Sequence, residues 1–476
     1  MAMLPSTTRA AAFLTAVGLL LVTPGVVVAQ PATSTDAAEP GYATPPPLPP
    51  GTQPPNDTGK PDLTYQLKTE CVKSLGQNIQ LLYKSKGQDR LRITEAQKFA
   101  TGKDVKVAVI DTGVHPHPYL GDRLSGGGDY VDQKRNGLED CDGHGTEVAG
   151  IIAAKTPSKI GFKGVAPDAT IVSIRQSSAN YTGKPKATAD DPDPKDVPAG
   201  NLTTLAMAIR RASDAGAKVI NMSVDSCRPA GPITAPEQTL QAALRYAVDV
   251  KDVVLVSSAG NLNQNNCPSQ NNGPDPQRPS TIVTPPWFAD YVMSVAAVDE
   301  NGDPADFSVQ GPWVTVAAPG TDIISLDPAT DGLANRTVIN GQLSPIQGTS
   351  FAAPYVSGLA ALVRQKYKTL NARQVMRRIE QTAQHPATPG GRDNVVGYGM
   401  IDPVAALTTY IPEEDGVAPA KAIKLPGGLP PAQEPDWAPM QVALLGTGGG
   451  IGLLFATMFV VHTVRRNKGP KPAHRT

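Results

Sequence analysis

The sequence lacks the residue patterns that build common metal sites. Its 476 residues include only four cysteines, and no two of them form a C-x-x-C pair. This spacing argues against a structural zinc site, which usually draws on such pairs. No pattern of calcium ligands is present either. We therefore expect neither a bound metal nor a cofactor.

The sequence also lacks an excess of charge of either sign. Lysine plus arginine and aspartate plus glutamate each number 43, so the formal net charge is zero. A balanced charge provides no overall basic field to attract nucleic acid, and we expect no nucleic-acid partner. Internal repeats are absent. Proline (47 residues) and glycine (45 residues) are by contrast abundant, which indicates linkers or irregular segments.

An apolar run near the N-terminus has the features of an export signal. Arg9 precedes the run Ala11–Val22, and small residues that suit cleavage follow at Val27–Ala29. We interpret residues 1–29 as a signal peptide, with a buried strand or helix as the alternative. Export favours disulfides, and four cysteines allow three pairings. The cysteines are Cys71, Cys141, Cys227 and Cys267.

A second apolar run lies near the C-terminus. Met440–Val461 contains no charged residue, and as a helix it would be about 33 Å long, enough to cross a bilayer. We predict a transmembrane helix over residues 439–462, followed by a short basic tail over 463–476. Positive residues favour the cytoplasmic side, so the tail is expected in the cytoplasm and residues 30–438 outside it. The prediction is a single-pass cell-membrane protein held in the lipid bilayer by one C-terminal helix.

Between these runs, strand and helix signals alternate. Unbroken apolar strands that alternate with helices predict an α/β fold with a mainly parallel, doubly wound sheet and helices on both faces. The predicted strands are Val105–Ile110, Ala169–Ile174, Lys218–Val224, Val253–Ser257, Val292–Val298 and Val314–Ala317. The predicted helices cover residues 201–215, 239–250, 350–367 and 371–383.

Three segments interrupt or flank this alternation. Residues 39–62 are dense in proline and predict an extended, polyproline-like segment, part of an N-terminal extension over 30–90. A second proline-rich linker covers residues 409–438. Residues 176–200 form a polar stretch too long for an ordinary connection. A disordered surface insertion is one interpretation of this stretch, and its structure is otherwise left open.

Two short motifs combine an acidic residue and a histidine with glycines. Asp111 directly follows an apolar strand, at the edge of the sheet where active sites of such folds lie. His144, one of only six histidines, lies in Asp142-Gly-His-Gly-Thr and begins a predicted helix. Histidine suits general-base catalysis near neutral pH. Each motif alone has a structural alternative, a turn aspartate and a structural histidine.

A third motif, Gly348-Thr-Ser-Phe-Ala-Ala-Pro, places Ser350 at the start of a helix. The free N–H groups of a first helical turn suit a developing oxyanion, although a serine here also serves as a simple N-cap. Asn261 follows another apolar strand and has an amide that could donate a second hydrogen bond.

In this order, the aspartate, histidine and serine motifs resemble the subtilase family of serine proteases over about residues 91–408. The resemblance implies a subtilisin-like peptidase domain with Asp111, His144 and Ser350 as catalytic triad. It also implies an oxyanion hole made by Asn261 and the Ser350 amide. The implied substrate-binding residues are Ser223, Val224, Asp225, Ser258, Ala259 and Gly260.

One substrate-binding position departs from the family pattern. Many subtilases have glycine where this chain has Asp225. An acidic side chain here is expected to narrow the cleft and to disfavour acidic substrates.

The flanking segments narrow the resemblance further. A signal peptide, a proline-rich extension, two cysteine pairs and a C-terminal anchor are similar to those of mycosins, the membrane proteases of type VII (ESX) secretion systems. This resemblance implies a secretion membrane complex as partner, secreted proteins as substrates, and the disulfides Cys71–Cys141 and Cys227–Cys267. Two functions follow as hypotheses: a membrane-anchored endopeptidase, or a structural component of the complex in which proteolysis is secondary. A soluble nutritional protease is disfavoured because an anchor prevents release.

Overall fold

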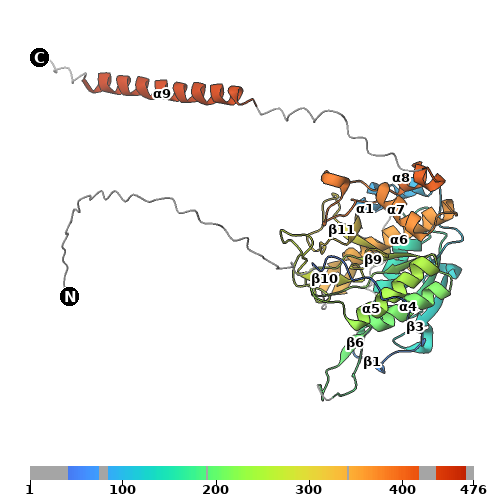
Figure 1. Ribbon diagram of the computed structural model, residues 1–476. Coiled ribbons are helices and arrows are strands. Elements are labelled where there is room, and N and C mark those ends of the chain that lie inside the picture. The colour runs from blue at the N-terminus through green and yellow to red at the C-terminus, as the bar shows by residue number, and fades with distance from the viewer. Residues whose placement is uncertain (1–40, 74–83, 189–190, 340–341, 418–435, 468–476) are drawn as a thin grey trace, which may run out of the picture. The chain divides into compact units, whose positions relative to one another are not determined.

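The computed structural model describes residues 41–73, 84–188, 191–339, 342–417 and 436–467 (Figure 1). The chain divides into two compact units, Met1–Glu414 and Asp415–Thr476. The predicted signal peptide, most of the proline-rich linker and most of the basic tail lie outside the described residues.

The first unit is built on a seven-stranded sheet in which all neighbouring strands are parallel. Apart from one glycine-rich edge strand, the strands are apolar runs with almost no exposed side chain, which explains why they occupy the centre of a doubly wound fold. Their spatial order is β12 (Val314–Pro319), β11 (Val292–Val298), β9 (Val254–Ser258), β7 (Val219–Met222), β2 (Lys106–Asp111), β4 (Thr170–Arg175) and β3 (Leu124–Asp129).

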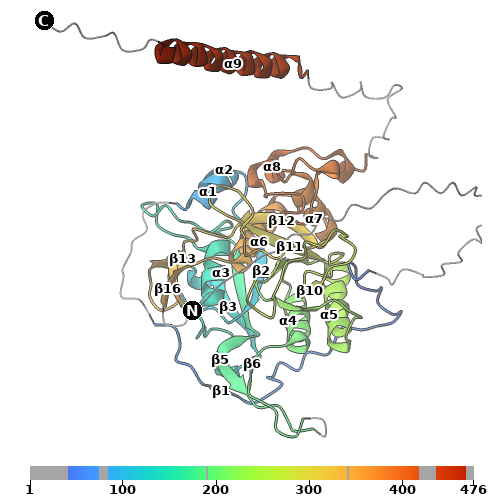
Figure 2. The same ribbon diagram turned by 90° about the vertical axis from the view of Figure 1, so that its left-hand side faces the viewer.

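Helices on both faces of the sheet complete the predicted α/β architecture (Figures 1 and 2). The helices α3 and α6 pack against each other, as do α4 and α5. Three of the helices begin with a capping box, with the N-cap residues Asn201, Thr234 and Asn371. The long helices are α3 (His144–Ala153), α4 (Leu202–Asp214), α5 (Ala235–Arg245, continued by a π-helix at Tyr246–Val250), α6 (Thr349–Lys366) and α7 (Ala372–Gln381).

The strand order reverses at β2. From β2 the chain passes to β3 at the edge of the sheet, returns through β4, which lies between β3 and β2, and then crosses to β7, on the other side of β2. Crevices at such a switch point are the usual ligand sites of open α/β sheets. Asp111 is the last residue of β2, so the fold places it at this crevice.

The polar stretch 176–200 forms a strand near each of its ends, so the interpretation as a disordered insertion is wrong for these two segments. The strands β5 (Ser178–Gly183) and β6 (Val197–Ala199) pair antiparallel, and β1 (Tyr65–Leu67) of the N-terminal extension adds to β5. Figure 2 shows this small sheet at one end of the first unit. The sequence did not predict this sheet, because the strand β1 that completes it lies more than 100 residues before β5.

The N-terminal extension is fixed along the first unit by hydrogen bonds to its backbone carbonyls. Residues 41–64 contain no helix or strand, in agreement with the predicted extended segment. Trp287 donates to the carbonyl of Tyr42 (2.9 Å), and Arg245 to that of Thr52 (2.6 Å). Asp57 accepts the Tyr130 hydroxyl at 2.7 Å. The extension therefore acts as a strap over α5 and β3 rather than as a separate domain.

Short elements complete the first unit. They are α1 (Lys86–Arg90), α2 (Ile93–Ala96), α8 (Pro403–Thr408), and the antiparallel pairs β8 (Ser226–Pro229) with β10 (Thr281–Thr284), β13 (Ser325–Leu326) with β14 (Leu333–Ala334), and β15 (Arg336–Ile339) with β16 (Gln342–Pro345).

The long helix in the described part of the second unit is α9 (Ala438–Asn467). Its 30 residues include the predicted span 439–462, and its most apolar window has a mean hydropathy of 1.9. Its length and composition suffice to cross a membrane.

Candidate active site

Asp111 and His144 meet at the carboxyl edge of the sheet. The Nδ1 atom of His144, the first residue of α3, lies 2.7 Å from Oδ1 of Asp111. Asp111 is fully buried. A carboxylate that accepts from Nδ1 fixes the orientation of an imidazole and leaves Nε2 free to take up a proton.

Glycines explain how α3 approaches the end of β2 so closely. A Cβ atom at residue 145 would lie 2.0 Å from the carbonyl oxygen of Gly113 and 3.1 Å from Cβ of Asp111, so only glycine fits there. Gly143, directly before the histidine, adopts φ +87°, a conformation that favours glycine. The two glycines that flank His144 are therefore required by its position.

Asp140 joins the two loops that carry these residues, although no sequence motif predicts this role. Its Oδ1 accepts from the Thr112 hydroxyl and from the Gly143 amide, both at 2.8 Å. Its Oδ2 accepts from the amide of Thr146 at 2.8 Å. Burial raises the pKa of the Asp140 carboxyl, although these donors oppose that effect.

Ser350 lies in the first turn of α6 and is 8% exposed. Its backbone N–H belongs to the group of first-turn donors that have no partner within the helix. Next to it, Asn261 accepts the Thr349 amide through Oδ1 at 2.9 Å. Among the described residues, the Asn261 Nδ2 group donates to no protein acceptor, so this donor is available for an oxyanion.

The His144 ring lies beside the helix that begins with these residues. It packs against the ring of Phe351, the residue after Ser350, with 5.1 Å between ring centroids. No hydrogen bond joins His144 and Ser350 within the described part of the chain. Such catalytic hydrogen bonds are often long before substrate binds. The structure thus places the three predicted triad residues near one another at the carboxyl edge of the sheet and shows one of the two expected contacts.

Two titratable groups on α3 have altered acidity. Burial lowers the pKa of His144, but the negative charge of Asp111 and its hydrogen bond outweigh burial and raise that pKa to about 9. Glu147 lies one helical turn further on, and burial raises its pKa to about 8. Ionised Glu147 also contributes to the raised pKa of His144, so the two groups are coupled.

Two of the residues predicted to bind substrate contact the first turn of α6. The Ser223 hydroxyl donates to the Ser350 carbonyl at 2.6 Å, and the Gly260 amide donates to the Thr349 hydroxyl at 3.2 Å. Val224 and Asp225 follow the end of β7, and Ala259 follows the end of β9. Ser258, the last residue of β9, donates its hydroxyl to Asp225.

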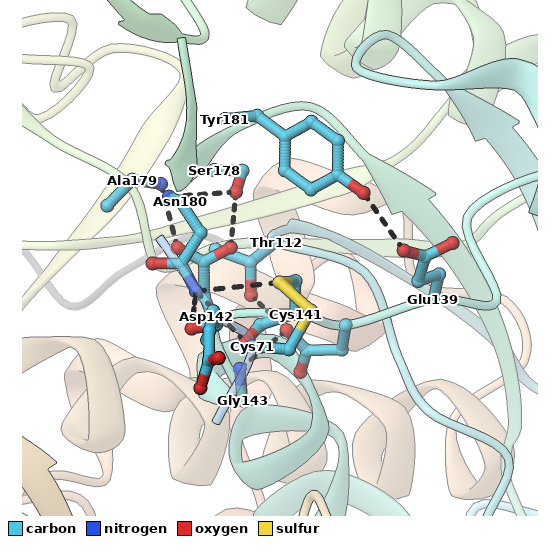
Figure 3. The surroundings of a disulfide bond; sticks show 12 residues. Cys71, Thr112, Glu139, Cys141, Asp142, Gly143, Ser178, Ala179, Asn180 and Tyr181 are labelled. Carbon is cyan, nitrogen blue, oxygen red and sulfur yellow. Dashed lines mark hydrogen bonds between the residues drawn. A yellow bond between two sulfur atoms is a disulfide. The ribbon is translucent and has the colours of Figure 1, made fainter. Parts of the chain in front are cut away.

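Both predicted disulfides are present. Cys71–Cys141 ties the extension to the loop three residues before His144, and Cys227–Cys267 closes a loop near Asp225. Figure 3 shows the first disulfide, where the Asn180 amide donates to the Cys141 carbonyl at 3.2 Å. Asp142 accepts from the Ala179 amide at 2.7 Å, so β5 supports the same loop.

The described residues contain no group of three or more histidine, cysteine, aspartate or glutamate side chains placed to hold a metal ion.

A carboxylate–imidazole pair beside a helix whose first turn carries a serine, on this α/β scaffold, defines the subtilisin-like serine proteases. The Subtilase family matches residues 102–399, and the chain belongs to this family.

The relatives with high coverage are mycosins. Mycosin-1 of Mycolicibacterium smegmatis is 42% identical over 435 residues, which cover 88% of this chain and 93% of the relative. A crystal structure of MycP1 from the ESX-1 type VII secretion system matches with a TM-score of 0.70 at 41% identity, covering 79% of this chain and 99% of that one. A structure of the periplasmic assembly from the ESX-5 inner membrane complex includes a chain that matches at TM-score 0.71 and 40% identity, covering 82% and 100%. These matches confirm the resemblance to mycosins and the subtilisin-like fold.

Proposed function

We propose that this chain is a membrane-anchored serine endopeptidase that cleaves secreted proteins outside the cytoplasm. The observation that carries the proposal is the 2.7 Å contact between His144 Nδ1 and Asp111 Oδ1, made beside the helix turn that holds Ser350. Ser350 is the nucleophile, His144 the general base and then acid, and Asp111 the residue that orients the imidazole.

The chemistry proceeds through an acyl-enzyme. Nε2 of His144 takes the proton of the Ser350 hydroxyl as Oγ attacks the peptide carbonyl. The Ser350 amide and the Nδ2 group of Asn261 donate to the oxyanion that forms. His144 then passes the proton to the leaving amine, the peptide bond breaks, and a water molecule hydrolyses the ester by the same steps in reverse.

The proposed location follows from α9 and the residues around it. The helix is long and apolar enough to span a bilayer, and Arg465 and Arg466 stand in its last turn. Because the positive-inside rule favours basic ends on the cytoplasmic side, we propose a cytoplasmic C-terminus and a protease unit on the periplasmic or cell-wall side. Because the relatives are mycosins, we assign the chain to a type VII secretion system.

A structural role in the secretion complex is the second candidate. Its support is the match to a chain within the ESX-5 inner membrane complex, one structure of which covers 88% of this chain at 39% identity. A component fixed in such an assembly could stabilise it without cutting any protein.

Complementation separates these two functions. A strain that lacks this chain is supplied with the wild type or with Ser350→Ala, and export of type VII substrates and their cleavage are measured together. Proteolysis predicts uncleaved substrates with Ser350→Ala, whereas a purely structural role predicts identical export and identical substrate sizes. Immunoblots must show equal amounts of the two proteins in the membrane.

A further inference from the structure

A small cavity lies beside α3, one helical turn beyond His144. Its volume is about 30 Å³, enough to hold a water molecule. Three segments of the chain line it: the N-terminal extension, α3, and the hairpin of β13 and β14 with the start of β15. They contribute Val72 and Lys73, then Glu147, and then Asp327, Pro328 and Arg336. No residue of the proposed triad lines this cavity.

Two buried carboxyl groups share the cavity. Glu147 is 3% exposed and Asp327 is 9% exposed. Oδ1 of Asp327 accepts the Ala329 amide at 2.9 Å, whereas the Glu147 carboxyl has no hydrogen-bond partner within the described part of the chain. Neither group forms an ion pair with a described residue, and Lys73 pairs with Glu70 instead. A buried carboxylate without such partners is unfavourable, so Glu147 fits this environment best as the neutral acid.

The charged groups around Glu147 agree with this assignment. Burial is the main reason that the pKa of Glu147 is raised to about 8. Its negative neighbours act in the same direction, and a protonated His144 acts against them. The titratable and charged groups that face it are His144, Asp111 and Asp140 at the site, Asp327 in the hairpin, Lys73 in the extension and Arg336 in β15.

Two of the three walls of the cavity are fixed. Every residue of α3 after its first is buried. Val72 directly follows the disulfide Cys71–Cys141 and donates its amide to the Cys141 carbonyl at 2.8 Å. The hairpin is held less firmly, because β13 and β14 form only two residue pairs and the turn over residues 328–332 is partly exposed. A change of charge in the cavity should therefore move this turn.

The hairpin turn contacts the loop that leads to the proposed catalytic base. A Cβ atom at residue 143 would lie 2.8 Å from Cγ of Pro328, so Pro328 packs directly against Gly143, the residue before His144. The Ser325 hydroxyl, at the start of the hairpin, donates to the backbone carbonyl of Glu147. The position of the turn is thus linked to the first two turns of α3.

We propose that Glu147 and Asp327 form a pH-dependent latch, which holds the hairpin turn on α3 while Glu147 is protonated and releases it when both groups are ionised. A neutral acid can donate its proton to a water molecule in the cavity or to Asp327. Two carboxylates in a space with little water repel each other. The latch does not require Ser350 to cleave a peptide, so this inference goes beyond the proposed function.

The pH range of the latch follows from the raised pKa of Glu147. Its ordinary pKa of 4.5 applies when the turn is open, and the value of about 8 applies when the turn is closed. The closed form is therefore fully stable below about pH 4.5. It loses about tenfold relative to the open form for each pH unit up to about 8, and the equilibrium is constant above that pH.

Hydrogen–deuterium exchange, read by mass spectrometry, tests the latch in the full-length chain in detergent. All proteins carry Ser350→Ala, so the result is independent of proteolysis, and labelling times are scaled to the intrinsic exchange rate at each pH. Between pH 6.5 and pH 8, the protection of the amides in residues 325–334 should fall by about tenfold. His117, whose Nε2 donates to the Gly332 carbonyl at 3.0 Å, stays mainly neutral in this range because burial lowers its pKa.

One substitution removes the titrating group. Glu147→Gln keeps the size of the side chain but cannot ionise, so its hairpin should be equally protected at both pH values. Asp331→Asn removes an exposed carboxylate from the same turn and is the matched control, with the pH dependence of the parent protein. A parent hairpin whose protection is the same at both pH values would overturn the inference, as would a fall in Glu147→Gln as large as in the parent.

A second substitution keeps the test decisive if Glu147→Gln does not fold. Asp327→Asn removes a negative charge from the cavity and lowers the pKa of Glu147, so the latch weakens at lower pH. The fall in hairpin protection between pH 6.5 and pH 8 should then be smaller than in Asp331→Asn. An equal fall in these two variants would reject the latch.

Discussion

The Asp140 carboxylate accepts the Thr112 hydroxyl at 2.8 Å, and this bond ties the turn after Asp111 to the loop before His144. The same carboxylate holds the amides of Gly143 and Thr146, so it sets the position of the first turn of α3. Two of the three proposed triad residues are therefore held in place through one buried side chain that is not itself in the proposed triad.

Replacing Asp140 should impair catalysis more than binding. We expect Asp140→Ala to lower kcat by about 100-fold, because a shift of about 1 Å in a catalytic group has an effect of that size. KM should stay nearly constant, and the unpaired donors should reduce the free energy of unfolding by about 1–3 kcal/mol. Steady-state kinetics and denaturant titration measure these effects, with Asp193→Ala, which removes an exposed ion pair to Lys184, as control. A folded Asp140→Ala with wild-type kcat would show that the carboxylate does not position the triad.

The pH dependence of the enzyme should reflect His144. Catalysis requires the neutral imidazole, so kcat/KM should rise as pH increases through the pKa of His144. Asp111 and Glu147 raise this pKa to about 9. Glu147→Gln removes one of these negative charges, lowers the pKa of His144 and moves the rise to lower pH. Glu95→Gln, on the exposed side of α2, should leave the profile unchanged. Identical profiles for wild type and Glu147→Gln would refute the coupling.

Loss of the first disulfide should affect both stability and the site. Cys71→Ser is expected to lower the free energy of unfolding by about 2–4 kcal/mol. It should also lower kcat, because Cys141 lies in the loop that leads to His144. Peptide mapping without reduction checks the pairing directly, and a peptide that joins Cys71 to Cys227 or Cys267 would contradict the account.

The N-terminal strap should contribute stability without contributing to catalysis. Asp57 pairs with Arg211 at 2.8 Å and accepts the Tyr130 hydroxyl. Hydrogen bonds to charged groups are worth about 1.5–3 kcal/mol, and we expect Asp57→Ala to reduce the stability of the first unit by about that much. Thermal unfolding and peptide hydrolysis are measured together. A drop in kcat without any loss of stability would assign the strap to the active site instead.

Much of the central sheet could be predicted because its strands are unbroken apolar runs. The strand β3 could not be predicted for the opposite reason, because its central residues, Ser125 to Gly128, have hardly any apolar side chain. It forms a strand by pairing with its neighbour β4. The strands β5 and β6 are polar and depend on β1, so no local pattern reveals them.

The same distinction applies to the site. Asp111, His144 and Ser350 lie in short motifs that can be recognised in the sequence. The glycines of these motifs occupy positions where backbone segments approach each other closely. In the sequence, Asp140 cannot be distinguished from an ordinary polar turn residue. Its positioning role depends on a hydrogen bond to Thr112, which lies 28 residues earlier. The bond between Asp225 and Ser258 joins two strand ends and becomes visible only in three dimensions.

The activation of Ser350 by His144 is tested most directly by labelling with a fluorophosphonate, which reacts with activated serines. The full-length chain is treated with the probe, digested, and the labelled peptide identified by mass spectrometry. We predict a single label on Ser350, no label in Ser350→Ala, and labelling slowed by several orders of magnitude in His144→Ala, since loss of the histidine costs about 10⁶-fold in kcat in subtilisin. A folded wild type that takes up no label, or a His144→Ala variant that is labelled as fast as wild type, would contradict the proposed mechanism.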